Sequence, residues 1–316
     1  MDIIAIDDPT DAQILEWHAV VVAAQAGDHA DLPTLSQTSA RMLARGPRKW
    51  AALDGVMAGV VWLRPPVEPG RAGEIDIHVR PEYRRGGVGT ALLAVAADEL
   101  RARGSGTVIA QVLAGTPAVP FLEAHGFRCV LTLRELLLRV ADVDPDRLRA
   151  LVEAGPPRYR LVRWTGTVPA ELAGAFAAAK VAMSGPAAAD QLRWDADRVR
   201  EMAEMVAKRG DDLYTVAALH GDAVAGFTEV VVESANPARA AQYDTAVSPQ
   251  HRGRRLGIWV KAAMLEWLRA ERPEVTEIET DNADDNRHML AVNAELGFGE
   301  QREYREYQAE VADLPV

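Results

Sequence analysis

Hydrophobic and polar positions along the chain predict two successive sets of strands and helices. In the first set, apolar runs and period-two alternation predict strands over 3–6, 50–53, 56–63, 74–79, 107–113 and 127–140. Apolar positions at helical spacing predict helical segments across 11–45, a helix over about 87–103 and a short helix over 118–124. The turn Asp54-Gly55 joins two of these strands as a hairpin.

The same order of elements returns in the second half. Strands are predicted over 159–164, 213–219, 223–233, 242–247, 275–280 and 298–311, and helical segments over 169–208, about 256–270 and 286–296. In both halves strand hairpins come first, and a strand–helix–strand–helix order follows. This order predicts an α/β (α+β) fold in which a mixed, mostly antiparallel sheet is flanked by helices.

An internal repeat explains why the two halves agree. Four pairs of identical residues share an offset of 168 residues: Val79 and Val247, Pro81 and Pro249, Arg84 and Arg252, Gly89 and Gly257. Similar segments upstream and downstream keep nearly the same offset. We interpret this as a tandem duplication, with domains over 1–145 and 158–316 and a linker over 146–157.

Composition excludes several classes of protein. The chain has 316 residues and a formal net charge of −11, so disorder as its main feature and nucleic-acid binding are disfavoured. Cys129 is the only cysteine, which excludes an intrachain disulfide and favours a reduced, cytoplasmic setting. We expect no signal peptide, no membrane-spanning helix and no metal site, because none of the corresponding patterns occurs.

The motif that carries chemistry lies at a strand-to-helix junction in both copies. A strand ends at Val-x-Pro, and a basic, glycine-rich loop then opens a helix. Glycine lets the backbone approach a ligand closely, and a helix N-terminus offers unpaired N–H donors at the positive end of its dipole. The combination predicts an anion site suited to a pyrophosphate. The alternative is a structural turn with solvated arginines, which two copies in register disfavour.

Two segments together resemble a known family. Arg84-x-x-Gly87-x-Gly89 is similar to the Arg/Gln-x-x-Gly-x-Gly/Ala signature of the GNAT acyltransferase superfamily. The segment from Asn286 to Phe298 resembles the Asn-x-x-Ala…Tyr-x-x-x-Gly-Phe segment of that superfamily. The whole chain resembles the tandem two-domain type found in actinobacteria, an architecture shared by mycothiol synthase. The resemblance implies two tandem GNAT-like domains.

The resemblance also implies acetyl-CoA as co-substrate. In the family, loop N–H groups bind the CoA pyrophosphate and the backbone of the preceding strand pairs with the pantetheine arm. Carried over to the first copy, these contacts fall on Val79, Arg84, Arg85, Gly86, Gly87, Val88, Gly89 and Thr90. In the second copy they fall on Val247, Arg252, Gly253, Arg254, Arg255, Leu256, Gly257 and Ile258, with Asn286 as a further contact.

Each copy departs from the family pattern. Arg255 replaces the first signature glycine in the second loop, and Gly115 replaces the asparagine of the second motif in the first copy. The usual catalytic tyrosine is missing from both copies, because Leu122 and Asn293 occupy its positions. Tyr304 and Tyr307 on the last strand are candidates for the general acid, with packing as the alternative role.

Asp244 is the candidate general base, since it lies on the strand before the second loop, where a buried carboxylate is costly. Asp76 is its counterpart in the first copy. The alternative for both is an ion pair with a nearby arginine, or a solvated strand face. Because the second half keeps Asn286 and Asp244, we expect it to be the main catalytic unit. The first half, whose loop is intact, is the other possibility.

The function predicted from these residues is transfer of an acetyl or short acyl group from CoA to a primary amine of a small molecule. The alternative is a non-catalytic CoA-binding sensor or scaffold with degenerate sites. The acidic net charge favours a cationic amine by steering, without identifying it. We expect no nucleic-acid or membrane partner, and either a monomer or a homodimer.

Overall fold

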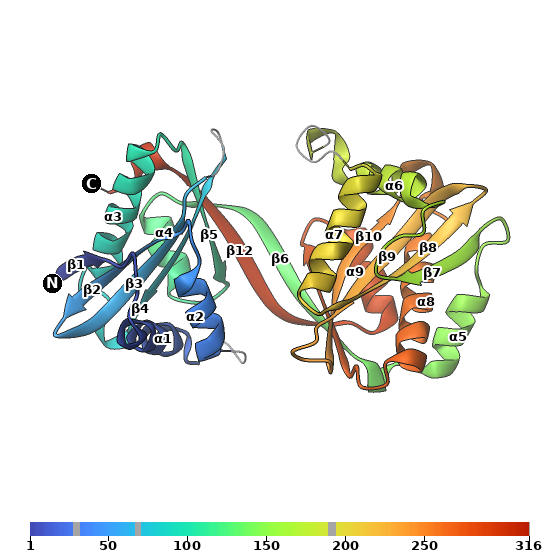
Figure 1. Cartoon of the computed structure of the whole chain (residues 1–316), viewed down its shortest axis with the longest axis horizontal. Helices are drawn as coiled ribbons and strands as arrows, with labels where there is room; N and C mark the ends of the chain where they lie inside the picture. Colours follow the sequence, from blue (N-terminus) through green and yellow to red (C-terminus); the bar gives the residue numbers. More distant parts are fainter. Residues whose placement is uncertain (28–31, 67–70, 189–193, 316) are drawn as a thin grey trace. The chain divides into compact units, whose positions relative to one another are not determined.

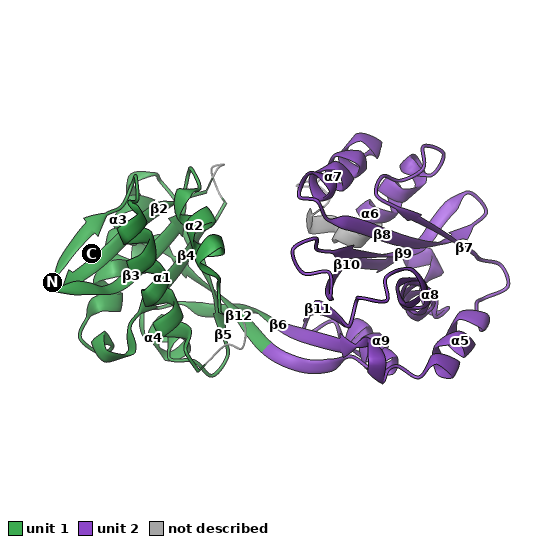
Figure 2. Ribbon diagram, turned by 60° about the horizontal axis from the view of Figure 1, so that its bottom comes forward, with its two compact units in different colours: residues 1–133, 303–316 green, residues 134–302 purple. Residues whose placement is uncertain are grey.

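The computed structural model describes residues 1–27, 32–66, 71–188 and 194–315, with side chains left out over 182–188. It divides into two compact units (Figure 2). Unit 1 consists of residues 1–133 and 303–316, and unit 2 of residues 134–302. Among the described helices, none has both the length and the apolar character that crossing a membrane requires.

Unit 1 contains the elements predicted for the first half (Figure 1). Its strands are β1 (Asp2–Ala5), β2 (Arg48–Asp54), β3 (Val56–Arg64), β4 (Gly73–Val79) and β5 (Thr107–Leu113). Its helices are α1 (Asp11–Gln25), α2 (Leu35–Leu43), α3 (Val88–Ala102) and α4 (Ala118–Ala124). The helical stretch predicted across 11–45 is therefore two helices, each with a threonine N-cap in a capping box.

Unit 2 repeats this order. Its strands are β7 (Arg160–Thr165), β8 (Asp212–His220), β9 (Ala223–Val232), β10 (Arg239–Val247) and β11 (Glu277–Ala283). Its helices are α5 (Pro145–Glu153), α6 (Ala173–Ala188), α7 (Ala196–Lys208), α8 (Leu256–Glu271) and α9 (Arg287–Leu296). The mixed sheet flanked by helices that the sequence predicts is confirmed in both units.

The last strand of each repeat is exchanged. β6 (Arg128–Arg139) begins in unit 1 and ends in unit 2, whereas β12 (Gly299–Glu310) begins in unit 2 and ends in unit 1. In unit 1, residues 304–310 of β12 pair antiparallel with residues 113–107 of β5. In unit 2, β6 is the neighbour of β11. The compact units therefore differ from the predicted ranges 1–145 and 158–316, which follow the sequence repeat.

Exchange is possible because the two strands are equivalent. β6 and β12 have the same length, 12 residues, and the same sequence of exposed, half-buried and buried positions. Each can therefore satisfy the edge of either sheet, as in the swapping of identical elements between protomers.

The predicted linker 146–157 is largely helical. Asp144 caps α5 with its side chain and Pro145 is the first helical residue, a pair of start signals that the sequence carries openly. Leu148 is buried in the core of unit 2, and the Trp259 indole N–H donates to the Val152 carbonyl at 2.8 Å. This segment is therefore a packed part of unit 2.

Helices cover both faces of each sheet. In β3, Val60 and Trp62 pack with α1 and α2, whereas Val61 and Leu63 pack with α3, as the period of two along a strand dictates. In unit 2, α6 and α7 cover one face, and α5, α8 and α9 cover the other. The two parallel strand pairs thus have helices on both sides, although most of their residues are only half-buried.

These parallel pairs are short, and this feature positions the site. Among the described residues, β4 pairs with β5 only at Gly73 and Glu74. In unit 2, β10 pairs with β11 only over residues 239–241. Beyond these points each pair separates toward its carboxyl ends. β10 also has a register shift against β9 between Gln242 and Thr245, whereas β4 runs in continuous register with β3.

Lys261 is an ionisable residue on the buried face of α8. Its counterpart at the offset of 168 is Leu93, which is fully buried. Lys261 is 4% exposed, its Nζ lies 5.1 Å from the ring centroid of Phe298, and burial lowers its pKa to about 7. The folded state therefore disfavours the ammonium form.

We predict that Lys261→Leu raises the free energy of unfolding by about 2 kcal/mol or more at pH 7, because the burial penalty is removed. The lysine pKa is lower in the folded chain, so the penalty is full below about pH 7 and falls as the pH rises toward 10.5. Urea unfolding at pH 7 and pH 9.5 tests this. A constant difference between wild type and variant at the two pH values would contradict it.

Candidate active site

The two glycine-rich loops adopt the same backbone conformation from different sequences. In the first loop, Arg85 and Gly87 have positive φ angles of 64° and 84°. In the second, the equivalent residues Gly253 and Arg255 have φ angles of 74° and 59°. Each loop thus needs two left-handed residues, and glycine supplies one of them in each copy. Arg255 therefore preserves the loop conformation in place of the signature glycine.

The signature arginines hold the loops in place. Arg84 donates from Nε to the Val79 carbonyl at 3.2 Å, and Arg252 makes the same contact with Val247 at 3.2 Å. Arg84 also donates to the carbonyl of Ala24 at the end of α1, at 2.8 Å. Both guanidinium groups bind the chain itself, so their role toward a ligand is to position the backbone.

Both loops lead directly into long helices. Gly87 is the N-cap of α3 and Arg255 is the N-cap of α8, and the first-turn N–H groups of a helix have no intrahelical acceptor. The side chains of Val88, Leu256 and Ile258 are buried, so these residues offer only their backbone. The residues present thus fit a pyrophosphate bound by backbone N–H groups.

The glycines and side chains after the N-cap differ between the copies. A Cβ atom at Gly89 would lie 3.0 Å from the Phe121 ring of α4, so that glycine allows α3 and α4 to pack closely. Thr90 is exposed, and its hydroxyl lies 3.1 Å from Nε2 of His125. In the second loop, Arg255 forms an ion pair with Glu295 at 2.6 Å. Arg254 donates to the Gln250 carbonyl at 2.7 Å.

Asp244 lies at the register shift of β10 and is ion-paired. Its Oδ2 accepts from Nζ of Lys180 at 2.7 Å, and Lys180 also pairs with the buried Glu229. Lys180 is 5% exposed, and its Nζ lies 4.8–5.6 Å from the ring centroids of Phe176, Trp194 and Phe227. Asp244 is thus in an ion pair, as the alternative expected, but its partner is a buried lysine and not a nearby arginine.

Charge interactions shift the pKa values of Lys180 and Glu229. Burial by itself lowers the pKa of Lys180, but the two carboxylates outweigh burial and raise that pKa above its ordinary value. Burial raises the pKa of Glu229 although Lys180 acts against it. A single buried ammonium therefore holds two carboxylates, Glu229 of β9 and Asp244 of β10, on the side of the sheet that faces α6.

Asp76, the counterpart of Asp244, has different partners. Arg41 of α2 lies 2.8 Å from it, and Nε2 of His78 on the same strand lies 2.9 Å from it. Burial alone would raise the pKa of the Asp76 carboxyl, but His78 and Arg41 outweigh burial and hold it below its ordinary value. Asp76 is therefore a carboxylate at neutral pH.

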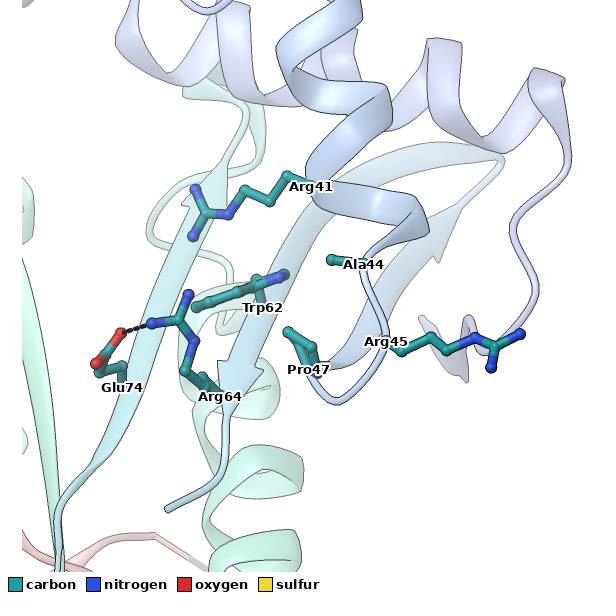
Figure 3. Close-up of a pocket in the computed structure, with 7 residues that line it drawn as sticks. All are labelled: Arg41, Ala44, Arg45, Pro47, Trp62, Arg64 and Glu74. Carbon is teal, nitrogen blue, oxygen red and sulfur yellow. Dashed lines mark hydrogen bonds and ion pairs between the residues drawn. The ribbon is translucent and has the colours of Figure 1, made fainter. Parts of the chain in front are cut away.

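A pocket of about 430 Å³ lies in unit 1 (Figure 3), and its lining includes Arg41, the partner of Asp76. It is lined by residues of α2, β3, β4 and the loop after α2, namely Arg41, Ala44, Arg45, Pro47, Trp62, Arg64 and Glu74. The guanidinium carbons of Arg41 and Arg64 lie 4.2 Å and 5.1 Å from the Trp62 ring centroid. Arg64 also pairs with Glu74 at 3.0 Å.

The remaining predicted site residues lie elsewhere in the fold. Asn286 is the N-cap of α9 and accepts from the Met289 N–H at 3.2 Å. Tyr304 lies opposite Leu113 in the pairing of β12 with β5, so it belongs to unit 1 whereas Asp244 belongs to unit 2. Tyr307 is buried and donates to Glu123 at 3.0 Å. The Tyr307 hydroxyl is therefore used in a hydrogen bond within the protein, and its ring is part of the core of unit 1.

Asn293 stands at the position of the usual catalytic tyrosine and is fully buried. Its amide donates to Asn282 of β11, and its own side-chain oxygen has no partner among the described residues. The position is thus polar, but it carries no acid.

Sequence reasoning missed Lys180, Glu229, Arg41 and Trp62. Two of them left a signal: Lys180 is the only charge in the run Ala175–Ser184, and Glu229 is the only charge in Ala223–Val232. A single charge in an apolar run is costly to bury unless it is paired, so an ion pair between Lys180 and Glu229 could have been predicted. Arg41 and Trp62 left no such signal.

The comparisons with known proteins agree with this geometry. The model of the acetyltransferase (GNAT) family matches residues 14–127 and 184–298, one match in each repeat. The chain belongs to the GNAT acetyltransferase family. It is a tandem member and a GNAT-type N-acyltransferase, so the resemblance seen in the sequence is confirmed.

Solved structures resemble the chain over almost its whole length. A tandem GNAT protein from the clavulanic acid biosynthesis pathway is 29% identical with a TM-score of 0.73, over 98% of both chains. A GCN5-related N-acetyltransferase from Sphaerobacter thermophilus is 17% identical with a TM-score of 0.72, over 98% of this chain and 96% of that one. A search of curated proteins finds no match.

A third similar structure belongs to a longer chain. The glucosamine N-acetyltransferase region of a fungal multi-domain β-N-acetylglucosaminidase is 16% identical with a TM-score of 0.70. The match covers 98% of this chain and 38% of the fungal one. At this identity the likeness concerns the fold.

We predict that Arg255→Gly changes the free energy of unfolding by less than about 1 kcal/mol. Relief of a left-handed arginine, about 1 kcal/mol, offsets the loss of an exposed ion pair with Glu295. Gly87→Ala is the matched change in the other loop and is expected to cost about 1 kcal/mol, since alanine disfavours φ of 84°. Urea denaturation of both variants checks this, and a larger loss for Arg255→Gly than for Gly87→Ala would contradict it.

We predict that Lys180→Met lowers the free energy of unfolding by about 3 kcal/mol at pH 7, because it leaves Glu229 buried without its cation. Without the cation, the Glu229 pKa rises further above its unfolded value of 4.5. Near pH 4.5 Glu229 is protonated in the folded variant, so the variant regains part of the lost free energy of unfolding. This regained part disappears as the pH rises through the folded pKa of Glu229. Denaturation at pH 5 and pH 7.5 measures this.

The exposed Lys208→Met serves as control, since Lys208 is 77% exposed. An equal loss for Lys180→Met at both pH values would mean that packing, and not the unpaired carboxylate, accounts for the effect.

Proposed function

We propose that this GNAT protein transfers an acetyl or short acyl group from CoA to the primary amine of a small molecule. The observation that carries the proposal is the pair of strand–loop–helix segments at separating parallel strands, β4 with α3 and β10 with α8. Each offers an open strand edge followed by a left-handed loop and a helix N-terminus. Such a segment suits an extended ligand that ends in a pyrophosphate.

Acetyl-CoA would supply the activated acyl group as a thioester. The loop residues from Arg84 to Thr90 and from Arg252 to Ile258 would hold its pyrophosphate, mainly through backbone N–H groups. Val79 and Val247 end the strands along which the pantetheine arm would lie. Asn286 stays a predicted contact, at the start of α9.

Asp244 and Tyr304 stay predictions as catalytic residues. One oxygen of Asp244 is bound by Lys180, and its side chain is 37% exposed, so the other oxygen is accessible to an amine. The cytoplasmic setting and the monomeric or homodimeric state likewise stay predictions from composition and from the family.

A non-catalytic CoA-binding role is the second candidate. It is favoured by the Lys180–Asp244 pair, which occupies the predicted base of unit 2, and by the absence of an acid at Leu122 and Asn293. Turnover distinguishes this role from transfer.

A matched pair of loop variants tests the proposal. Gly86 and Arg254 are equivalent by the offset of 168, both are exposed, and a Cβ at Gly86 meets nothing closer than 3.6 Å. We expect Gly86→Asp and Arg254→Asp each to weaken acetyl-CoA binding at one loop by about tenfold or more, because a carboxylate there repels the pyrophosphate. Calorimetry of acetyl-CoA binding measures the affinity.

Thiol release from acetyl-CoA with a panel of amines measures transfer. Loss of release in either variant, with folding retained, would identify the working loop. Unchanged acetyl-CoA affinity in both variants would contradict the assignment of the loops, and binding without release on any amine would favour the non-catalytic role.

A further inference from the structure

The pocket around Trp62 in unit 1 lies where an acyl acceptor would enter. β4 and β5 part after Glu74, so an arm lying between them ends near Glu74 and Asp76. Both carboxylates belong to the face of β4 that α2 covers, as the pairs Arg64 with Glu74 and Trp62 with Asp76 in the β3–β4 register show. The pocket opens on that same face.

The volume and lining suit a small molecule. About 430 Å³ is within the usual range of small-molecule sites. Trp62 and Pro47 give the pocket apolar surface, and the polar groups around them are almost all charged. In Figure 3 the guanidinium groups of Arg41 and Arg64 lie on either side of one end of the Trp62 ring, with Glu74 next to Arg64.

The charges favour a ligand that is itself charged at two points. Arg41 pairs with Asp76 and Arg64 pairs with Glu74, so Arg45 adds a third positive charge to the lining that neither carboxylate pairs with. Arg45 extends away from the others in Figure 3 and has no hydrogen-bond or ion-pair partner among the described residues. Guanidinium groups bind carboxylates through paired N–H donors, and each of Arg41 and Arg64 has donors beyond the one it uses.

Unit 2 has the opposite arrangement at the equivalent place. There Lys180 puts its own ammonium against Asp244, inside a cluster of three aromatic rings. The side of β10 that corresponds to the Trp62 pocket is thus occupied by a side chain of the protein. In unit 2 the Lys180 ammonium thus already holds one oxygen of the half-exposed Asp244, whereas in unit 1 an acceptor amine would meet a formed pocket.

We propose that the Trp62 pocket of unit 1 binds the acyl acceptor and selects a small amine that also carries a carboxylate. This inference rests on the proposed transfer function. The Arg41 and Arg64 guanidinium groups hold the acceptor carboxylate, and the amine lies toward Glu74 and Asp76. In transfer, the amine nitrogen bonds to the thioester carbonyl carbon, the carbon–sulfur bond breaks, and CoA leaves as the thiolate. The proton lost by the amine passes to Glu74.

The proposal reverses an expectation from composition. A net charge of −11 favours a cationic acceptor through long-range steering, but the pocket is locally positive. Salt screens charges that are farther apart than the Debye length, about 8 Å at physiological ionic strength. The arginines that contact the ligand therefore affect its binding more than the distant acidic surface does.

The test uses matched probes: β-alanine, phenylalanine and 4-aminobenzoate, each compared with its carboxamide, and putrescine as a cationic probe. Binding to the whole chain is measured by calorimetry with CoA present, and transfer by thiol release from acetyl-CoA. We expect at least one acid to bind about tenfold more tightly than its amide, since a paired guanidinium contact is lost in the amide. Arg64→Gln and Arg41→Gln should reduce that ratio toward one.

Arg103→Gln is the control, because Arg103 is the half-exposed C-cap residue of α3, pairs with Glu99 and lies outside the pocket lining. Equal binding of every acid and its amide, tighter binding of putrescine, or an unchanged ratio in both pocket variants would overturn the proposal. A further outcome is that the acids bind selectively, both pocket variants abolish this selectivity, and no thiol is released. This outcome would support the pocket assignment and contradict the proposed transfer function.

Discussion

The separation of two parallel strands is the constraint on which each unit depends. β4 leaves β5 after two residue pairs, and β10 leaves β11 after three. Strand edges that open inside a sheet leave backbone N–H and C=O groups that need partners. The chain provides some of them itself, since the signature arginine turns back to the carbonyl that ends the strand. The rest form an edge suited to an extended ligand, and the loop and helix N-terminus stand at its end.

The two copies treat the carboxylate on this strand in opposite ways. Asp76 is held by an arginine and a histidine at the border of a pocket, and Asp244 is held by a buried lysine that Glu229 also binds. The second arrangement places two carboxylates around one ammonium in an aromatic environment, where loss of the ammonium would leave Glu229 buried and unpaired. The two copies thus share a backbone frame and differ in the charges that meet this strand.

The exchange of β6 and β12 makes the two units interdependent in sequence. Unit 1 is completed by the last residues of the chain, and unit 2 receives a strand that begins in the first repeat. Because the two strands share one burial pattern, the core of each sheet is satisfied by either strand. A cut at the boundary of the sequence repeat would leave each half with the other unit's closing strand.

Local patterns in the sequence were sufficient for the elements, the repeat and the loops, because strand and helix periodicity and glycine-rich turns depend on neighbouring residues. Thr107–Leu113 and Ala118–Ala124 have the predicted bounds, and the family followed from the loop motif. Local patterns could not predict the strand exchange, because β6 and β12 have the same burial pattern and either strand fits either unit. The partners of Asp76 and Asp244 also depended on the fold, because Arg41 and Lys180 come from helices distant in sequence. The chain by itself determined which backbone it forms; only tertiary packing decided which charges meet on it, since ion pairing depends on distances in space that sequence spacing does not encode.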